Sequence, residues 1–282
     1  MDSDHLGGLE PAEKQIEVGG FKWNYLEWNS TGTKTILLVH GITSNSRTWW
    51  HLGPDLAQAG VRVLAVDMPG HGYSEDSPEG VAWPITADQL ASFVAALGLN
   101  RTGYRLCGHS WGGAVSLTLA ANHPAGLERV ALLDPALYLD NDWAEQGAGN
   151  YQKEVGQPKK SREEYLAWTK ENMPAWTPSD HYWKAGAMLA YRPETVRDFY
   201  RHNIGQNITA LLGQVEVPLL LVISDENIGG VLTAPVQAEA RAALKPATGQ
   251  AIRYEGVGHN LHREDYARLV QDLQPFLLGS LA

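Results

Sequence analysis

Short apolar runs rich in Val, Leu and Ile recur along the chain, each five to seven residues long. They lie at residues 35–40, 61–67, 104–108, 129–134 and 218–224, and a last strand-like run lies at 251–255. Such runs, which lack a regular polar alternation, are typical of strands covered on both faces. Helix-like stretches lie between them, at residues 51–59, 86–97 and 116–122. Because strands and helices alternate, the pattern predicts an α/β fold with a mostly parallel, doubly wound sheet.

The two ends of the pattern carry one further element each. Residues 21–28 (FKWNYLEW) alternate between apolar and polar positions, as an exposed edge strand does. Residues 265–278 have the pattern of a closing amphipathic helix.

The alternation of strands and helices breaks once, from about residue 136 to residue 206. Strand-like runs are absent there, and the sequence becomes polar, aromatic and helical in pattern. A chain of 282 residues is about one large domain or two small ones. We therefore expect an α/β core domain at residues 1–135 and 207–282, and a helical cap inserted at residues 136–206.

Composition and charge exclude several classes of partner and location. The formal net charge of −10 disfavours binding to nucleic acids or anionic membranes, both of which reward clustered Lys and Arg. Cys107 is the only cysteine, so no intrachain disulfide forms and a reducing compartment is expected. Residues 1–5 (MDSDH) lack the basic flank and apolar run of a signal peptide, and no apolar stretch is long enough to span a membrane. We expect a cytoplasmic protein with no nucleic-acid or membrane partner.

The strongest chemical signal is a G-x-S-x-G pattern at residues 108–113 (GHSWGG). It follows the strand predicted at 104–108 and precedes an alanine-rich helix. Glycines on both sides of the serine permit a sharp turn from strand to helix, which exposes the serine hydroxyl at the carboxyl edge of the sheet. The start of the following helix then favours negative charge that develops nearby. Ser110 is therefore a candidate nucleophile.

Four motifs in order give the chain its resemblance to the α/β-hydrolase superfamily, over nearly its whole length. They are His40-Gly41 after the first buried strand, residues 67–74 (DMPGHGYS), residues 108–113 (GHSWGG) and residues 256–261 (GVGHNL). The resemblance implies a hydrolase with Ser110 as nucleophile, His259 as general base and a helical cap between two strands of the sheet. Related dehalogenases and epoxide hydrolases use an Asp nucleophile, which disfavours those activities.

The chemistry of a serine nucleophile also indicates His259, because a serine hydroxyl is a poor nucleophile until an imidazole accepts its proton. His259 follows the last strand-like run on a glycine-flanked loop. We interpret His40 and His109 as hydrogen-bonded supports. His262 has no carboxylate or thiol partner at a convincing ligand spacing, so neither a metal site nor a cofactor is expected.

The acid that orients His259 is less evident. Many members of the superfamily carry G-x-x-D after the strand at 218–224, but here that count falls on Asn227. We favour Asp225, which ends this strand 34 residues before His259. Asp134, at the end of the preceding strand, is the rival because some relatives carry their acid there. Glu226, or no acid at all, is the remaining alternative.

Cleavage of a carbonyl substrate also needs donors for an oxyanion and a pocket for the substrate. The N–H of Trp111 is one expected donor, and the resemblance implies Ile42 as the second. The segment 136–206 holds 11 of the 25 aromatic residues, which either form a core of the cap or line a substrate pocket. The candidates for an aromatic pocket above Ser110 are Trp143, Trp168, Trp176, Trp183 and Tyr191. Cys107, inside its strand, is expected to be buried and inert.

These features predict a serine hydrolase that cleaves carboxylic ester bonds of a small hydrophobic substrate through an acyl-enzyme at Ser110. A carboxylesterase, an arylesterase and a lactonase all fit this description. A carbon-carbon bond hydrolase or an aminopeptidase on the same fold is an alternative. A ligand-binding receptor without turnover is another, supported only by the doubtful position of the acid.

Overall fold

The apolar runs form the central strands of an eight-stranded sheet in the computed structural model, which describes residues 9–279. The strand order is β1-β2-β4-β3-β5-β6-β7-β8, parallel from β4 to β8 and antiparallel at β1 and β2. The strands are β1 (Ala12–Val18), β2 (Phe21–Trp28), β3 (Thr35–Val39), β4 (Arg62–Val66), β5 (Tyr104–His109), β6 (Leu127–Leu133), β7 (Leu219–Ile223) and β8 (Gly249–Arg253). The predicted α/β fold with a mostly parallel, doubly wound sheet is confirmed.

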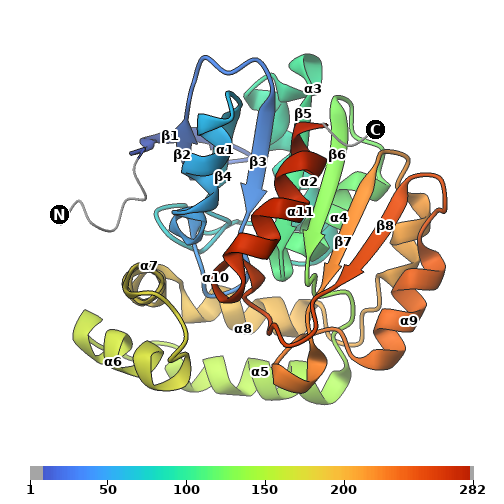
Figure 1. Ribbon diagram of the computed structural model, residues 1–282. Coiled ribbons are helices and arrows are strands. Elements are labelled where there is room, and N and C mark those ends of the chain that lie inside the picture. Colours follow the sequence, from blue (N-terminus) through green and yellow to red (C-terminus); the bar gives the residue numbers. More distant parts are fainter. Residues whose placement is uncertain (1–8, 280–282) are drawn as a thin grey trace.

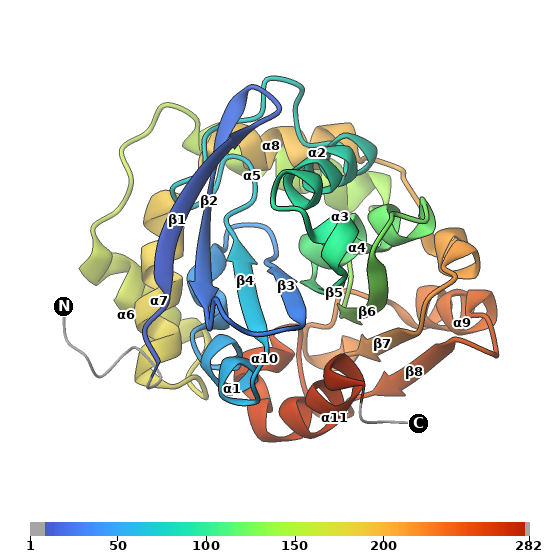
Figure 2. The same ribbon diagram turned by 90° about the horizontal axis from the view of Figure 1, so that it is seen from above.

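Each face of the sheet is covered by helices and has an apolar core of its own (Figure 2). One face packs on α2 (Trp83–Ala96), α4 (Trp111–Ala121) and α9 (Ala234–Ala243), and the other on α1 (Leu52–Gln58) and α11 (Tyr266–Leu278). Along β3, Leu37 and Val39 belong to the first core, and Ile36 and Leu38 to the second. Successive side chains of a strand point to opposite faces, so a strand buried on both faces is apolar at every position. Short helical elements are α3 (Leu99–Thr102), α10 (Leu261–Glu264) and the 3-10 turns η2 (Ser46–Trp49), η3 (Thr209–Gln214) and η4 (Glu226–Ile228).

Four helices, here named the cap helices, connect β6 to β7. They are α5 (Asn141–Glu154), α6 (Arg162–Asn172), α7 (Pro178–Ala190) and α8 (Pro193–His202). Figure 1 shows them as a layer beyond the carboxyl ends of the parallel strands. Two of them begin with a capping box, formed by Ser161 with Glu164 and by Thr177 with Asp180, which satisfies N–H groups of their first turns.

The amino-terminal edge of the sheet differs from the prediction. The strand at 21–28 was expected at an exposed edge, but β2 lies between β1 and β4 and is almost entirely buried. Two buried polar residues of β2 made the strand look exposed in the sequence, and both have polar partners. Asn24 donates a hydrogen bond to Asp67, and Glu27 forms ion pairs with Lys14 and Arg62. The true edge is β1, whose sequence (AEKQIEV) is too polar to be recognised as a strand.

Two expectations about location depend on particular segments. Within residues 9–279, the helices are all too short or too polar to cross a membrane. Residues 1–5, which carried the expectation about a signal peptide, lie outside the described residues.

Candidate active site

Ser110 occupies the turn between β5 and α4, in a backbone conformation that non-glycine residues rarely adopt. Its φ and ψ angles are 56° and −119°. The flanking glycines are required by close packing: a Cβ on Gly108 would lie 2.3 Å from the carbonyl oxygen of Gly112, and one on Gly112 would lie 2.4 Å from that of Val39. The turn thus fixes the Ser110 side chain at the carboxyl edge of the sheet, where it lines a pocket.

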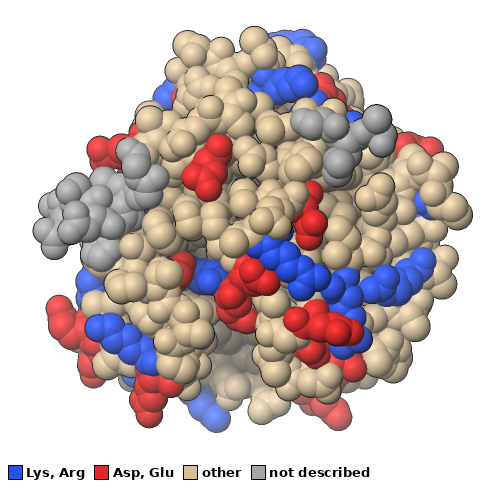
Figure 3. All heavy atoms as spheres, viewed as in Figure 1, with Lys and Arg blue, Asp and Glu red and all other residues tan. Residues whose placement is uncertain are grey.

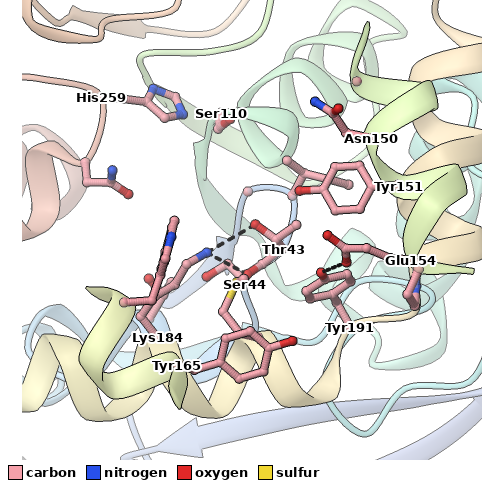
Figure 4. Close-up of a pocket in the computed structure, with 18 of the residues that line it drawn as sticks. Thr43, Ser44, Ser110, Asn150, Tyr151, Glu154, Tyr165, Lys184, Tyr191 and His259 are labelled. Atoms are coloured by element: carbon pink, nitrogen blue, oxygen red, sulfur yellow. Dashed lines mark hydrogen bonds between the residues drawn. The ribbon is translucent and has the colours of Figure 1, made fainter. Parts of the chain in front are cut away.

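His259 lies on the loop between β8 and α10, and its Nδ1 is 2.7 Å from Oδ2 of Asp134. The Asp134 carboxylate is fully buried and also accepts the backbone N–H groups of Ser224 and Val231. Because the carboxylate can only accept, His259 donates its Nδ1–H, and its Nε2 is left bare to accept a proton. Figure 4 shows the His259 ring pointing toward Ser110 at one end of the pocket.

The expectation that Asp225 is the partner of His259 is wrong. The Asp225 carboxylate accepts the backbone N–H groups of Gly256 and Asn227 and the side-chain amide of Asn227. These hydrogen bonds, first among them that from Gly256, lower the pKa of the Asp225 carboxyl. Asp225 therefore braces the loop that carries His259, and Asp134 takes the place beside the imidazole. Glu226 is directed to the amide of Gln237, 3.4 Å away.

The two histidines expected as supports do hold backbone groups around the site. His40 accepts the N–H of Met68 at Nε2, 2.9 Å away, and its Nδ1 donates to the carbonyl of Gly41. Burial lowers the pKa of His40 to about 4. His109 donates from Nε2 to the carbonyl of His259 at 2.8 Å, and burial with the nearby His259 holds its pKa well below the usual value. Both rings are neutral at pH 7, as donors and acceptors in fixed tautomers.

The loop of residues 41–44 approaches Ser110 from the end of β3. A Cβ added to Gly41 would lie 2.8 Å from Cβ of Ser110, so the loop passes directly over the nucleophile. Thr43 has a φ of 55°, its N–H donates to Nε2 of His71, and its carbonyl accepts Nζ of Lys184. Trp111 opens α4, so its N–H has no acceptor within the helix. Of the two expected donors, Trp111 therefore directly follows Ser110, and Ile42 follows Gly41 and lines the same pocket as Ser110.

A cavity of about 1000 Å³ extends from Ser110 and His259 into the cap helices. Four of the five predicted aromatic residues line it: Trp143, Trp168, Trp176 and Tyr191. The structure does not bring the fifth, Trp183, into the lining, because its ring lies beside the Arg47 guanidinium at 5.2 Å and edge-on to Tyr182. Cys107 is buried within β5, and burial raises the pKa of its thiol, so it is an inert core residue as expected.

Charged residues in the lining were missed by the sequence analysis. They are Lys153, Glu154, Lys159, Lys160, Lys184 and Arg263. Lys184 lies in α7, where burial and the nearby Arg263 lower its pKa to about 7. Burial lowers the pKa of Lys159 to about 8, and its Nζ lies 3.2 Å from the centre of the Tyr191 ring. The only sequence feature that could have indicated Lys184 is its place in the aromatic segment HYWKAG (residues 181–186), and a lysine in such a segment does not by itself predict a pocket residue.

No group of three or more His, Cys, Asp or Glu side chains in residues 9–279 is arranged to hold a metal ion. His262 is the histidine that the sequence analysis considered as a metal ligand. Its Nε2 forms a hydrogen bond with the hydroxyl of Thr48 at 2.9 Å.

Comparison with known proteins gives matches along most of the chain. A family model described as the alpha/beta hydrolase fold matches residues 34–209, more than half of the chain. N-formylmaleamate deformylase of Pseudomonas putida is 28% identical over 261 residues, which cover 89% of this chain and 90% of that protein. Other curated relatives match over shorter stretches, spanning 22% of bifunctional epoxide hydrolase 2 of Rattus norvegicus and 41% of lipase LipV of Mycobacterium tuberculosis.

Two solved structures have similar folds at low sequence identity. E-2-(acetamidomethylene)succinate hydrolase superposes with a TM-score of 0.80 and 20% identity, covering 95% of this chain and 99% of that one. The carboxylesterase CesB of Bacillus subtilis gives a TM-score of 0.77 and 19% identity, covering 97% and 94%. The nucleophile turn, the order of the strands and the family match agree, and the chain therefore belongs to the α/β-hydrolase family.

Proposed function

We propose that this protein is a serine hydrolase that cleaves carboxylic ester bonds through an acyl-enzyme at Ser110. The observation that carries the proposal is the 2.7 Å contact between His259 Nδ1 and Asp134 Oδ2, on a histidine whose ring points toward Ser110. A buried carboxylate that holds the Nδ1–H leaves Nε2 free to accept the serine proton, and it stabilises the imidazolium that forms.

The reaction then follows in two halves. The Oγ of Ser110 attacks the ester carbonyl carbon while His259 Nε2 takes its proton, and the carbonyl oxygen becomes an oxyanion. The N–H groups of Ile42 and Trp111 are the donors for this oxyanion. When the intermediate collapses, the alcohol leaves with the proton from His259. A water molecule then attacks the acyl-enzyme, with His259 again as base and then as acid, and the carboxylic acid is released.

The pocket favours an ester or lactone with an apolar part. Trp143, Trp168, Trp176 and Tyr191 offer aromatic surface, and the cavity is large enough for a substrate of the size of most metabolites. The similar structure of a carboxylesterase supports this class. Because one relative is a deformylase, an N-formyl amide is also a substrate worth testing.

The alternatives lose support for different reasons. The receptor hypothesis was supported only by the doubtful position of the acid, and the contact between Asp134 and His259 weakens that support. An aminopeptidase must hold a substrate ammonium, but the charged lining in residues 9–279 is five basic side chains and one Glu. A carbon-carbon bond hydrolase shares the same triad chemistry, so assays must separate it from an esterase.

The test is a panel of aliphatic esters, aryl esters, lactones, an N-formyl amide and a vinylogous diketone, assayed with the wild type and with Ser110→Ala. We expect ester or lactone turnover that the variant lacks, and a burst of alcohol release when deacylation is slow. Turnover of the diketone alone would replace the esterase proposal with a carbon-carbon hydrolase. Ester turnover that survives in Ser110→Ala would refute the acyl-enzyme.

A further inference from the structure

The charge of the pocket is opposite to that of the whole chain. Acidic residues outnumber basic ones by 32 to 22 in the sequence, but the lining described above has five basic side chains and a single carboxylate, Glu154. On the face of the molecule shown in Figure 3, acidic and basic side chains are interspersed. The lining of the pocket therefore carries an excess of basic side chains in a protein whose net charge is −10.

The one carboxylate of the lining does not neutralise these cations by a direct ion pair. Glu154 accepts the hydroxyl of Tyr191 at 2.6 Å. The Nζ of Lys159 is buried above the Tyr191 ring and has no hydrogen-bond partner. The Asp134 carboxylate is not part of the lining, because it lies behind His259.

Lys184 is the cation with the most defined place. Its Nζ donates to the carbonyl of Thr43 at 2.8 Å and to the Thr43 hydroxyl at 3.1 Å, as the dashed lines of Figure 4 show. An ammonium has three donors, so one remains for a ligand. Among the residues that the structure describes, no carboxylate forms an ion pair with Lys184. Lys184 is partly buried, and burying an ammonium without a counterion costs free energy that binding of an anionic ligand would offset.

The position of Lys184 also limits where an anion can lie on a substrate. Thr43 follows Ile42, one of the proposed oxyanion donors, and Gly41 lies against Ser110. Thr43 and Gly41 are two residues apart, so their Cα atoms are separated by at most about 7 Å. The same short loop therefore links Lys184 to the nucleophile, so an anion bound by Lys184 lies in the part of the pocket that contains Ser110.

We propose that Lys184 binds a substrate carboxylate, so that the preferred substrates are esters or lactones that carry an ionised carboxylate a few bonds from the scissile carbonyl. This inference rests on the proposed esterase function and names its substrate class. Arg263, whose guanidinium lies over the Trp176 ring at 4.4 Å and donates to Thr48, is paired with the buried Asp180 carboxylate at 3.9 Å, so Lys184 is the cation of the two that lacks an ion-pair partner. The aromatic walls hold the apolar part of the same substrate.

The experiment compares matched anionic and neutral esters by continuous titration of the acid released. Monoethyl glutarate with ethyl valerate places the carboxylate on the acyl side, and butyryloxyacetate with ethyl butyrate places it on the alcohol side. We expect the wild type to prefer the anionic member of at least one pair, by about 10- to 100-fold in kcat/KM, as for hydrogen bonds to charged groups. Equal or greater kcat/KM for the neutral member of both pairs would overturn the proposal.

The variants separate recognition of charge from support of the loop. Lys184→Met removes both hydrogen bonds to Thr43 as well as the charge, so the readout is the ratio of kcat/KM for the anionic and neutral esters. We expect this ratio to fall by about 10- to 100-fold, mostly through KM, and Lys184→Arg to restore part of it. Lys170→Met makes the same change on an exposed residue of α6 outside the lining and leaves the ratio unchanged. A ratio that Lys184→Met leaves intact would show that Lys184 only supports the loop.

Failure of the two proposals can be told apart. If the wild type hydrolyses esters through Ser110 without preference for the anionic ones, the carboxylate site is wrong and the esterase stands. If no ester is turned over, calorimetry of glutarate against valeramide with the wild type and Lys184→Met still decides the site. Glutarate binding that Lys184→Met removes supports it, and equal binding of both ligands refutes it.

Discussion

His259 and Asp134 are hydrogen-bonded at 2.7 Å although 125 residues separate them in the sequence. Asp134 has a φ of 39°, an unusual conformation at the end of β6 that turns its carboxylate toward the neighbouring strands. There it accepts hydrogen bonds from the backbone N–H groups of Ser224, after β7, and Val231, as well as from the imidazole of His259, which follows β8. One carboxylate thus ties together the ends of three adjacent strands, which fixes the histidine relative to the nucleophile turn.

Asp134→Asn is expected to lower kcat by about 10⁴-fold while the protein stays folded. The side chain keeps its size, and its carbonyl can still accept a backbone N–H. Its amide, however, presents a donor to His259 Nδ1, which forces the proton onto Nε2 and removes the base from Ser110. Ester turnover at saturating substrate, with circular dichroism as the check of folding, measures this effect.

Asp225→Asn is the matched comparison, because it makes the same change on the neighbouring strand. We expect kcat within about threefold of the wild type, with a lower melting temperature, since Asp225 braces Gly256 and Asn227. A collapse of kcat in Asp225→Asn together with normal kcat in Asp134→Asn would mean that the His259 contact is not the catalytic one.

The sequence predicts much of this site because its motifs encode local geometry. The G-x-S-x-G pattern at Ser110 predicts a sharp turn from strand to helix because only glycines fit the close packing there. The buried strands are predicted because they are apolar on both faces. The acid is different: Asp134 and Asp225 end adjacent parallel strands, β6 and β7, so strand positions alone do not separate them. The turn geometry after each strand decides, and it depends on contacts with loops far away in the sequence. The same holds for Lys184, whose position follows from how α7 packs over the loop at Thr43.

Gly112→Ala is expected to destabilise the protein because of a clash with backbone. A Cβ at this position would meet the carbonyl oxygens of Val39 at 2.4 Å and of His40 at 2.5 Å, and neither can move without disturbing β3. We expect the free energy of unfolding in urea to fall by about 3 kcal/mol or more.

Gly149→Ala is its control, since both glycines lie within helices. A Cβ on Gly149, in α5, meets nothing within 4 Å. Alanine is favoured over glycine inside a helix, so this variant should gain about 0.5–1 kcal/mol. If both variants changed the free energy of unfolding in the same direction and to the same extent, the close packing of α4 on β3 would not be what requires Gly112.

The KM for an anionic ester should rise with pH above about 7, if Lys184 binds its carboxylate. Burial and the nearby Arg263 lower the pKa of Lys184 to about 7, so the ammonium is charged below this pH and neutral above it. Lys159 lines the same pocket and has its pKa lowered by burial to about 8, so its step is separated by the Lys184 variants; Arg263 has its pKa lowered by burial only to about 10, and burial holds those of His71, His109 and His262 well below normal. The KM of monoethyl glutarate is therefore expected to increase by up to about tenfold per pH unit from pH 7 to 9.

Ethyl valerate supplies the internal control for this pH profile, because it carries no charge and its KM should stay flat over the same range. In Lys184→Arg the inflection should move upward beyond the range, since a guanidinium stays protonated. An inflection near pH 7 that persists in both Lys184→Arg and Lys184→Met belongs to another group and would contradict the assignment.

Trp143 and Trp168 should set the preference for the length of the acyl or alcohol chain. Both line the pocket and remain 42% and 37% exposed, so truncating them removes pocket surface without opening the core. An indole that covers about 50 Å² of a substrate chain contributes about 1.3 kcal/mol at about 25 cal/mol per Å², or about tenfold in kcat/KM. Trp143→Ala and Trp168→Ala should therefore lower kcat/KM for octanoate esters about tenfold relative to butyrate esters. Trp183→Ala, which removes an indole outside the lining, should leave this ratio unchanged, and an equal loss in all three variants would assign the effect to general loosening of the cap helices.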